Sequence, residues 1–391
     1  MQLSTRLTNL NGGGSDGWEV FLRAREMIAA GDTVIELTIG EHDIRTDPSI
    51  LAAMEASARG GHTGYATVPG IPALRDAVAA RVQARTGVRT GRANVLITPG
   101  GQAALFMTHH ATCPEGARAL FIDPYYATYP GTIRGVGAVP VPVRTHAADG
   151  FRPRAADIDA LADGAASLLI NSPNNPTGAV YDRATLEGIA TVCHDRDLWL
   201  ISDEVYDTQV WQGDHLSPRA LPGMARRTLV IGSMSKSHAM TGSRIGWIVG
   251  PAEVISHLSA LATVTTYGVP GFVQDAALFA LGSGLEDQIA APFRRRRALA
   301  QDILARQNTV GLIPAEGAMY LMLDIRATGL DGRAFAFALL DAEKIAVMPG
   351  ESFGQSAAGH IRVAMTVADD AFADALGRLC AFAEGLAAGQ G

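Results

Sequence analysis

Five short apolar runs, separated by segments of helical spacing, constrain the fold of this chain more than any other feature of its sequence. Each run has the length of a β-strand and lacks polar alternation, which is typical of strands buried on both faces of a parallel sheet. Their alternation with helical segments predicts βαβ units and a doubly wound α/β fold. The expected strands are Asn94–Thr98, Ala119–Ile122, Ser167–Asn171, Leu198–Ser202 and Thr228–Gly232.

The pattern changes after Pro292, where we expect a long helix and then strand-like runs. Because 391 residues are too many for one ordinary core, this change predicts a second, smaller α+β domain, which the N-terminal segment with its helix at about 18–30 completes. We predict an N-terminal arm at 1–45, flexible at Gly12-Gly13-Gly14, a large ligand-binding domain at 46–292 and a small domain at 293–391. The strand-like runs are Met319–Asp324, Ile345–Val347 and His360–Ala364.

Composition narrows the class of protein. The chain is 48% hydrophobic and 18% charged, which predicts a soluble globular protein, and it has no apolar run long enough to span a membrane. The first residues, Met1 to Asn11, lack the apolar stretch of a signal peptide, so we expect a cytoplasmic protein. A net charge of −7 argues against a nucleic-acid partner. The basic run Arg294–Arg297 is interpreted as a solvated helix face rather than a phosphate-binding patch.

Lysine is rare in this chain: of 32 basic residues, only Lys236 and Lys344 are lysine. A guanidinium stays protonated near neutral pH, whereas a lysine amine can lose its proton and attack a carbonyl. The scarcity therefore favours amine chemistry at these two positions, although a skewed base composition of the gene explains the arginine excess equally well.

Polar or glycine residues follow each expected strand directly. Ligands of doubly wound sheets bind outside the carboxyl ends of the strands, so we expect these residues to converge on one site. The five sets are Gly100-Gly101-Gln102, Asp123 to Tyr126, Asn174-Asn175, Asp203 with Tyr206, and Ser233 to Lys236.

Two of these sets suit a phosphate. Ser233 and Ser235, with Arg244, would place two hydroxyls and a guanidinium beside the Lys236 amine. Thr98-Pro-Gly-Gly-Gln102 opens a helix at about 103–112, and the free N–H groups at a helix start bind anions. Taken alone, each motif is also compatible with an ordinary turn.

A third set suits an aromatic nitrogen ring. Asp203 can pair with a protonated pyridine nitrogen, or else cap the following segment as a helix N-cap. Tyr206 and Asn175 can reach a phenolic oxygen on such a ring, and Tyr126 can stack on its face or serve as a core aromatic. The ten histidines show no metal-ligand pattern, so no metal site is predicted.

Together these motifs resemble the class I/II, fold-type-I aminotransferases that depend on pyridoxal 5′-phosphate (PLP), and more closely their aspartate-aminotransferase-like prokaryotic branch. The most specific pieces are Ser172-Pro-Asn-Asn-Pro-Thr-Gly178, Ser202-Asp-Glu-Val-Tyr206 and Ser233-Met-Ser-Lys236 through Arg244. The resemblance runs from Leu37 to Ala364. It implies a homodimer that binds PLP in the large domain and moves an amino group from an L-amino acid to a 2-oxo acid by a ping-pong mechanism.

The resemblance also implies roles for single residues. Lys236 is similar to the lysine that holds PLP as a Schiff base and moves the Cα proton, and Asp203 to the partner of the pyridine nitrogen. Asn175 and Tyr206 resemble the residues at the phenolic oxygen. Tyr65 resembles the tyrosine that reaches the phosphate of the neighbouring subunit. The implied phosphate site comprises Gly101, Gln102, Ser233, Ser235 and Arg244, and the implied substrate site comprises Gly40, Tyr126, Asn175 and Arg362.

One position departs from the pattern of the resembled branch. Its aspartate-specific members carry a lysine where this chain has Gln102, and that lysine helps to bind the second carboxylate of the substrate. Gln102 is neutral, so we expect L-aspartate not to be the best amino donor.

Three other functions remain as alternatives. A PLP-dependent β-lyase would share the fold and the cofactor, since neither decides the reaction. A PLP-binding regulator would need an added DNA-binding unit, which we do not expect ahead of the arm that starts at Met1. A nicotinamide-dependent oxidoreductase would share the doubly wound sheet, but the GxGxxG motif is missing after the first strand.

Overall fold

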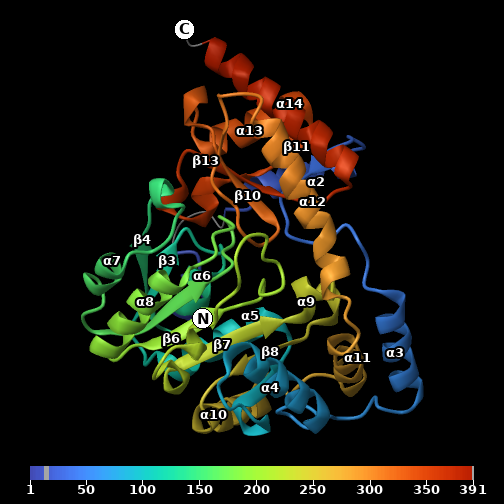
Figure 1. The fold of residues 1–391 in the computed structure, drawn as a ribbon, viewed down its shortest axis with the longest axis vertical. Helices are drawn as coiled ribbons and strands as arrows, with labels where there is room; N and C mark the ends of the chain where they lie inside the picture. Colours follow the sequence, from blue (N-terminus) through green and yellow to red (C-terminus); the bar gives the residue numbers. More distant parts are fainter. Residues whose placement is uncertain (13–16, 390–391) are drawn as a thin grey trace.

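The structure, a computed structural model, describes residues 1–12 and 17–389. Gly13 and Gly14 of the predicted flexible arm lie outside the described residues. Figure 1 shows a large sheet flanked by helices and, beyond one edge of this layer, a second group of helices around smaller sheets.

The main sheet has seven strands in the order β2-β8-β7-β6-β5-β3-β4. All of its neighbouring pairs are parallel except those of β8 (Gly246–Val249), which runs antiparallel to β2 and β7. The predicted α/β fold with a mostly parallel, doubly wound sheet is confirmed. The five expected strands are present as β2 (Val95–Thr98), β3 (Arg118–Asp123), β5 (Ala165–Asn171), β6 (Trp199–Asp203) and β7 (Thr228–Ser233).

Two strands of this sheet are missing from the sequence-based prediction. β4 (Val139–Arg144) contains Pro140 and Pro142, which cannot donate to a neighbouring strand. It lies at the edge of the sheet and pairs only with β3, so these prolines are tolerated there. β8 has only four residues, a run too short to stand out from its surroundings.

Helices cover both faces of the main sheet, which explains why its strands are apolar throughout. Successive residues of a strand point to opposite faces. Leu200 and Ile201 in β6 illustrate this, because both are fully buried but belong to different hydrophobic clusters. One face packs on α5 (Gly100–Thr112), α6 (Tyr129–Gly135) and α10 (Ala252–Val264). The other packs on α3 (Pro48–Arg59), α4 (Pro72–Thr86), α7 (Ala155–Asp159), α8 (Arg183–Asp195) and α11 (Gly271–Leu281).

A second hydrophobic core lies around an antiparallel sheet in the order β12-β13-β10-β9. The N-terminal segment contributes to it, because β1 (Ile35–Glu36) pairs in parallel with β11 (Ile345–Ala346). The domain limits at residues 45 and 292 remain a prediction. The sheet comprises β9 (Gly311–Leu312), β10 (Tyr320–Asp324), β12 (Met348–Pro349) and β13 (His360–Ala364), and the helices around it are α2 (Glu19–Ala29), α12 (Glu286–Leu304), α13 (Gly332–Glu343) and α14 (Asp369–Ala388).

Helix α12 corrects two expectations. It begins at Glu286 and passes through Pro292, so the expected start after this proline is wrong. Ile289 and Phe293 on either side of the proline are buried, and we attribute the continuity of the helix to this packing. In Figure 1 the helix runs from the level of α9 and α11 towards α14 and so joins the two groups of elements.

The second correction concerns the basic run in α12, which was expected to form a solvated face. The side chain of Arg296 is only 3% exposed. It binds Asp43 at 2.7 Å and Asp369 at 2.8 Å, because the helix turns this residue towards the N-terminal segment and the start of α14. Arg295 in the same run remains 58% exposed, as expected for a solvated side chain.

The remaining α-helices of the described chain are two short ones, α1 (Thr5–Thr8) and α9 (Met234–Ser237). No helix in residues 1–12 and 17–389 has the length and apolar character needed to cross a membrane.

Candidate active site

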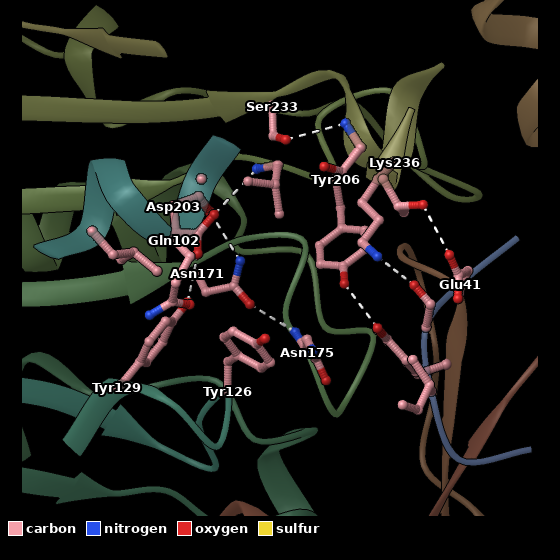
Figure 2. A pocket seen from close by; sticks show the side chains of 18 of the residues that line it. Glu41, Gln102, Tyr126, Tyr129, Asn171, Asn175, Asp203, Tyr206, Ser233 and Lys236 are labelled. Carbon is pink, nitrogen blue, oxygen red and sulfur yellow. Dashed lines mark hydrogen bonds between the residues drawn. The ribbon is translucent and has the colours of Figure 1, made fainter. Parts of the chain in front are cut away.

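A cavity of about 310 Å³ lies at the carboxyl ends of β5, β6 and β7, where the main sheet faces β10 and β13. It brings together residues that are far apart in the sequence, as expected for ligands at the edge of a doubly wound sheet. Figure 2 shows the central part of this cavity. Twelve of the predicted site residues line it: Gly40, Gly101, Gln102, Tyr126, Asn175, Asp203, Tyr206, Ser233, Ser235, Lys236, Arg244 and Arg362.

The Lys236 amine projects into the cavity from α9, the single helical turn that follows β7 (Figure 2). Its Nζ donates a hydrogen bond to the carbonyl oxygen of Gly40. Burial lowers the pKa of the amine to about 8, and the positive charges of Arg362 and Arg244 act in the same direction, against Glu41. A larger fraction of the amine is therefore uncharged near neutral pH, as a nucleophile or general base requires.

Asp203, at the end of β6, is 4% exposed. Its Oδ2 accepts a hydrogen bond of 2.8 Å from the phenol of Tyr129, and its Oδ1 accepts one of 3.3 Å from the backbone of Val205. Burial raises the pKa of Asp203 to about 6, although both hydrogen bonds act to lower it. Such a buried carboxylate fits a protonated ring nitrogen, because a cation would stabilise its charge.

A group of small residues and one arginine, Arg244, lies together on one side of the cavity and forms a cradle with donors for an anion. Helix α5 begins at Gly100, whose φ of +81° favours glycine, and a Cβ there would lie 2.5 Å from the guanidinium of Arg244. The hydroxyl of Ser233 accepts the backbone N–H of Ser235 at 3.1 Å. A helix N-terminus, hydroxyls and a guanidinium are the donors that a phosphate dianion needs.

The guanidinium of Arg362 lies between two aromatic rings, 4.4 Å from the centre of Tyr320 and 4.3 Å from that of Phe353. Its NH1 donates to Oδ1 of Asn175 at 2.9 Å, and its NH2 donates to the carbonyl of Thr38. Within the described residues its buried Nε has no hydrogen-bond partner. An incoming carboxylate would supply the missing acceptor and the compensating charge.

Gly40 and Tyr320 show why the wall opposite the main sheet needs a glycine. A Cβ at Gly40 would lie 1.7 Å from the phenolic oxygen of Tyr320, which is an impossible contact. That oxygen also lies 2.9 Å from the phenolic oxygen of Tyr206. The absence of a side chain at Gly40 therefore lets the Tyr206–Tyr320 pair approach the backbone that binds Lys236.

Gln102 is held by two threonines on the side of the cavity formed by α5 and α6. Its Nε2 donates to the hydroxyl of Thr132, and its Oε1 accepts from Thr128, each at 3.0 Å. Both polar atoms of this neutral side chain have partners. The expectation that this neutral residue disfavours an acidic substrate remains a prediction.

Several residues that line the cavity are absent from the sequence-based prediction. Tyr129 lies 74 positions before Asp203 in the sequence, and Tyr320 lies outside the main sheet, so neither follows the strand-end pattern. Asn171 is the last residue of β5, and its Oδ1 accepts the backbone N–H of Asn175 at 2.7 Å (Figure 2). Its place at a strand end was a usable indication. Glu41 was identifiable only through its neighbour Gly40.

Tyr65 is the one predicted site residue that does not line the cavity of its own chain. Its side chain is 90% exposed, and its ring packs at 5.0 Å on that of Tyr267, which is also exposed. The predicted reach to a neighbouring subunit requires such an exposed side chain, and it remains a prediction.

Comparisons with known proteins agree with this geometry. The family described as aminotransferase class I and II matches residues 32–379. This match covers most of the chain and includes Lys236, the buried Asp203 and Arg244. The chain belongs to this family. Its members are PLP-dependent enzymes, so the predicted aminotransferase class and the predicted cofactor are confirmed.

The aminotransferase is similar to its relatives and to solved structures over nearly its whole length. It is 40% identical over 388 residues to an arginine–pyruvate transaminase of Pseudomonas aeruginosa, covering 97% of this chain and 98% of the relative. It is 33% identical over 363 residues to an aspartate/prephenate aminotransferase of Thermus thermophilus, covering 91% and 92%. The structure of an aspartate aminotransferase from Thermus thermophilus with maleate matches with a TM-score of 0.91 at 31% identity, covering 97% of this chain and 100% of that one.

Proposed function

We propose that this aminotransferase holds PLP through Lys236 and accepts an L-amino acid other than aspartate as its preferred donor. The observation that carries the first part is the position of Lys236. Its amine has a lowered pKa and shares one cavity with the buried Asp203 carboxylate and the Arg244 cradle. A covalent bond to the aldehyde of the cofactor needs such an uncharged amine beside partners for the ring nitrogen and the phosphate.

Each remaining group of the cavity would have a defined task. When bound, PLP supplies an electron sink for the α-carbon of the substrate. Asp203 would keep the ring nitrogen protonated, and the Nδ2 amide of Asn175 and the hydroxyl of Tyr206 would bind the phenolic oxygen. Arg362 would hold the α-carboxylate of the amino acid. The released Lys236 amine would then remove the proton from the substrate Cα and pass it to the C4′ carbon of the cofactor.

The second part of the proposal, the donor, is supported by Gln102. A substrate with a second carboxylate would meet an amide that already binds Thr128 and Thr132, instead of a compensating ammonium. A relative with 40% identity is named an arginine–pyruvate transaminase, so arginine with pyruvate is the first pair to test. Glu41 favours a cationic donor, because its carboxylate lines the cavity and accepts a hydrogen bond of 2.9 Å from a neutral group, the hydroxyl of Thr241.

A half-transamination screen tests the donor. The holoenzyme is mixed with one amino acid at a time without a 2-oxo acid, and the loss of the absorbance at about 420 nm, a general property of lysine-bound PLP, is followed. We expect arginine or another non-acidic amino acid to react fastest. A kcat/KM for aspartate about tenfold or more above those for arginine, alanine, leucine, methionine and phenylalanine would contradict the proposal. Pyruvate and ammonia released from cysteine or cystathionine without an acceptor would instead favour the β-lyase.

The role of Lys236 is tested by substitution, and the second lysine of the chain provides the control. We expect Lys236→Ala to lose both the absorbance at about 420 nm and turnover. Lys344 caps the end of α13 with a φ of +55°, a conformation that asparagine tolerates, and it does not line the cavity, so Lys344→Asn is a mild change. We expect it to keep both properties. Retention of both by Lys236→Ala would refute the assignment.

A further inference from the structure

The backbone carbonyl of Lys236 is held by two side chains from distant parts of the sequence. His42 lies 2.9 Å from it through Nε2, and Gln209 donates to it through Nε2 at 3.2 Å. Both side chains are buried, with exposures of 9% for His42 and 1% for Gln209. The two side chains thus converge on one buried carbonyl, whose oxygen has two lone pairs with which to accept.

The position of this carbonyl explains why it needs outside partners. Helix α9 spans only Met234–Ser237, a single turn between a strand and a loop. The last carbonyls of a helix have no N–H of the same helix to accept from. Ser233 caps the start of this turn through the backbone of Ser235. At its other end, His42 and Gln209 provide the donors.

The two donors belong to segments that also form the cavity wall. His42 lies two residues after Gly40, whose carbonyl accepts the Lys236 amine. The segment 40–42 therefore contacts both ends of the same lysine, its Nζ and its backbone oxygen. The backbone N–H of Gln209 donates at 2.8 Å to the carbonyl of Tyr206, so the second donor is joined to another residue of the cavity.

The protonation of His42 is compatible with its role as a donor. Burial lowers its pKa to about 4, and the positive charge of Lys236 acts in the same direction. The ring is therefore neutral near pH 7, and the Lys236 carbonyl selects the tautomer with the proton on Nε2. The ring also packs edge-on against Phe293, with centroids 5.3 Å apart, which fixes its plane.

We propose that His42 and Gln209 are positioning residues that hold the backbone of Lys236 and thereby direct its amine into the cavity. This inference rests on the proposed function of Lys236. The new element is that a histidine and a glutamine, neither of which lines the cavity, set the orientation of the lysine. Loss of one donor should loosen the carbonyl, and loss of both should free the backbone of the turn to move further.

The test replaces each donor with a side chain of similar shape that cannot donate. His42→Phe keeps the ring against Phe293, and Gln209→Met keeps the length of the chain. His42→Gln restores an N–H and serves as the rescue. Gln274→Met is the matched control, because Gln274 is also a fully buried glutamine that donates to a backbone carbonyl, at 2.7 Å, but this carbonyl belongs to Val269, which does not line the cavity.

The first readout needs no turnover. The apoprotein is acetylated with a small reagent over a range of pH, and the labelling of its two lysines is measured by peptide mass spectrometry. Lys344 provides the internal standard. We expect the labelling rate of Lys236 relative to Lys344 to change about fivefold or more in the double variant, and the pH at which Lys236 becomes reactive to shift, because the amine leaves its present environment. Gln274→Met is expected to label like the wild type.

The second readout is the steady-state kinetics of the holoenzyme. Each single variant should lower kcat about three- to tenfold and the double variant about 30-fold or more, with little change in KM, because the substrate contacts remain. His42→Gln should recover most of the loss. Unchanged kcat and unchanged Lys236 labelling in the folded single variants would overturn the proposal, even if the double variant does not fold. An equal loss in Gln274→Met would also overturn it. If the proposed role of Lys236 itself is wrong, this will be seen separately, because Lys236→Ala will retain turnover.

Discussion

The phenol of Tyr129, at the start of α6, donates a hydrogen bond of 2.8 Å to the carboxylate of Asp203, at the end of β6. Both groups are buried, and burial raises the pKa of each. The hydrogen bond partly offsets the effect of burial on Asp203. The carboxylate that would face the ring nitrogen of the cofactor is thus held in its ionised form by a tyrosine from another element.

Removing this phenol should weaken the binding of PLP. In Tyr129→Phe the pKa of Asp203 should rise above its present value of about 6, so a smaller fraction is ionised at neutral pH. A hydrogen bond to a charged group contributes about 1.5–3 kcal/mol, which predicts roughly tenfold weaker binding at pH 7. Equilibrium titration of the apoprotein with PLP between pH 5 and 8 measures this. In the wild type, the affinity for PLP should decrease when the pH drops below about 6. In the variant, the same decrease should begin at a higher pH, so identical profiles would contradict the prediction.

The identity of residue 102 should control the use of acidic donors. Gln102→Lys places an ammonium between Thr128 and Thr132, where it can bind a second carboxylate. We expect kcat/KM for aspartate to rise about tenfold, the size expected for one charge-assisted hydrogen bond, and that for arginine to fall. Gln102→Met, which has a similar length but no charge, should show no gain for aspartate. Steady-state kinetics with both donors decides, and a similar gain in both variants would exclude a charge effect.

His109 predicts a pH-dependent contribution to stability. It is fully buried, neither ring nitrogen has a hydrogen-bond partner among the described residues, and burial lowers its pKa to about 4. An unfolded histidine has a pKa of about 6.5, so between pH 6.5 and 4 the unfolded state binds more protons and stability falls as the pH falls.

His109→Leu should remove this penalty. We compare the free energy of unfolding of the variant with that of the wild type at each pH. The difference in favour of the variant should be about 2 kcal/mol larger at pH 5 than at pH 8. Urea unfolding at the two pH values measures the difference. His110→Leu, at the exposed neighbouring position, is the control and should change much less. A pH-independent difference for His109→Leu would show that the folded histidine titrates normally.

The arginine run of α12 predicts two different mutational effects at adjacent positions. Arg296→Met leaves Asp43 and Asp369 without their buried partner and should lower the free energy of unfolding by about 2–3 kcal/mol, somewhat less than for a fully buried pair because both carboxylates are partly exposed. Arg295→Met removes an exposed ion pair with Asp369 and should change stability by less than about 1 kcal/mol. Chemical denaturation of both variants tests this contrast, and equal effects would contradict it.

Tyr65 predicts that two inactive variants can restore each other. If its exposed side chain completes the site of a neighbouring subunit, Tyr65→Ala and Lys236→Ala should each be impaired alone. Mixed dimers would contain one site with both native residues, so a random mixture should recover about a quarter of wild-type activity. Size-exclusion chromatography should show twice the chain mass of 41.0 kDa. If the two variants exchange subunits but the mixture recovers no activity, Tyr65 does not belong to the site of the neighbouring subunit.

Much of the candidate site was predictable because the parallel sheet converts a sequence pattern into a location. Asp203, Ser233 and Lys236 each follow an apolar run, and the carboxyl ends of parallel strands meet at one edge. The strand β4 and the start of α12 were not predictable in this way. Proline is tolerated at a sheet edge and within a well-packed helix, and both contexts depend on neighbours that a local pattern does not reveal.

The sequence by itself determined the doubly wound architecture, the family and the residues around Lys236, because burial on both faces and strand-end chemistry leave a local record along the chain. Only the tertiary structure decided which distant side chains act on these residues. Tyr129 binds Asp203, His42 holds the carbonyl of Lys236, and Arg362 binds Asn175 across 187 positions of sequence. Such contacts arise where one element packs on another, and apolar periodicity records that a residue is buried but not against what.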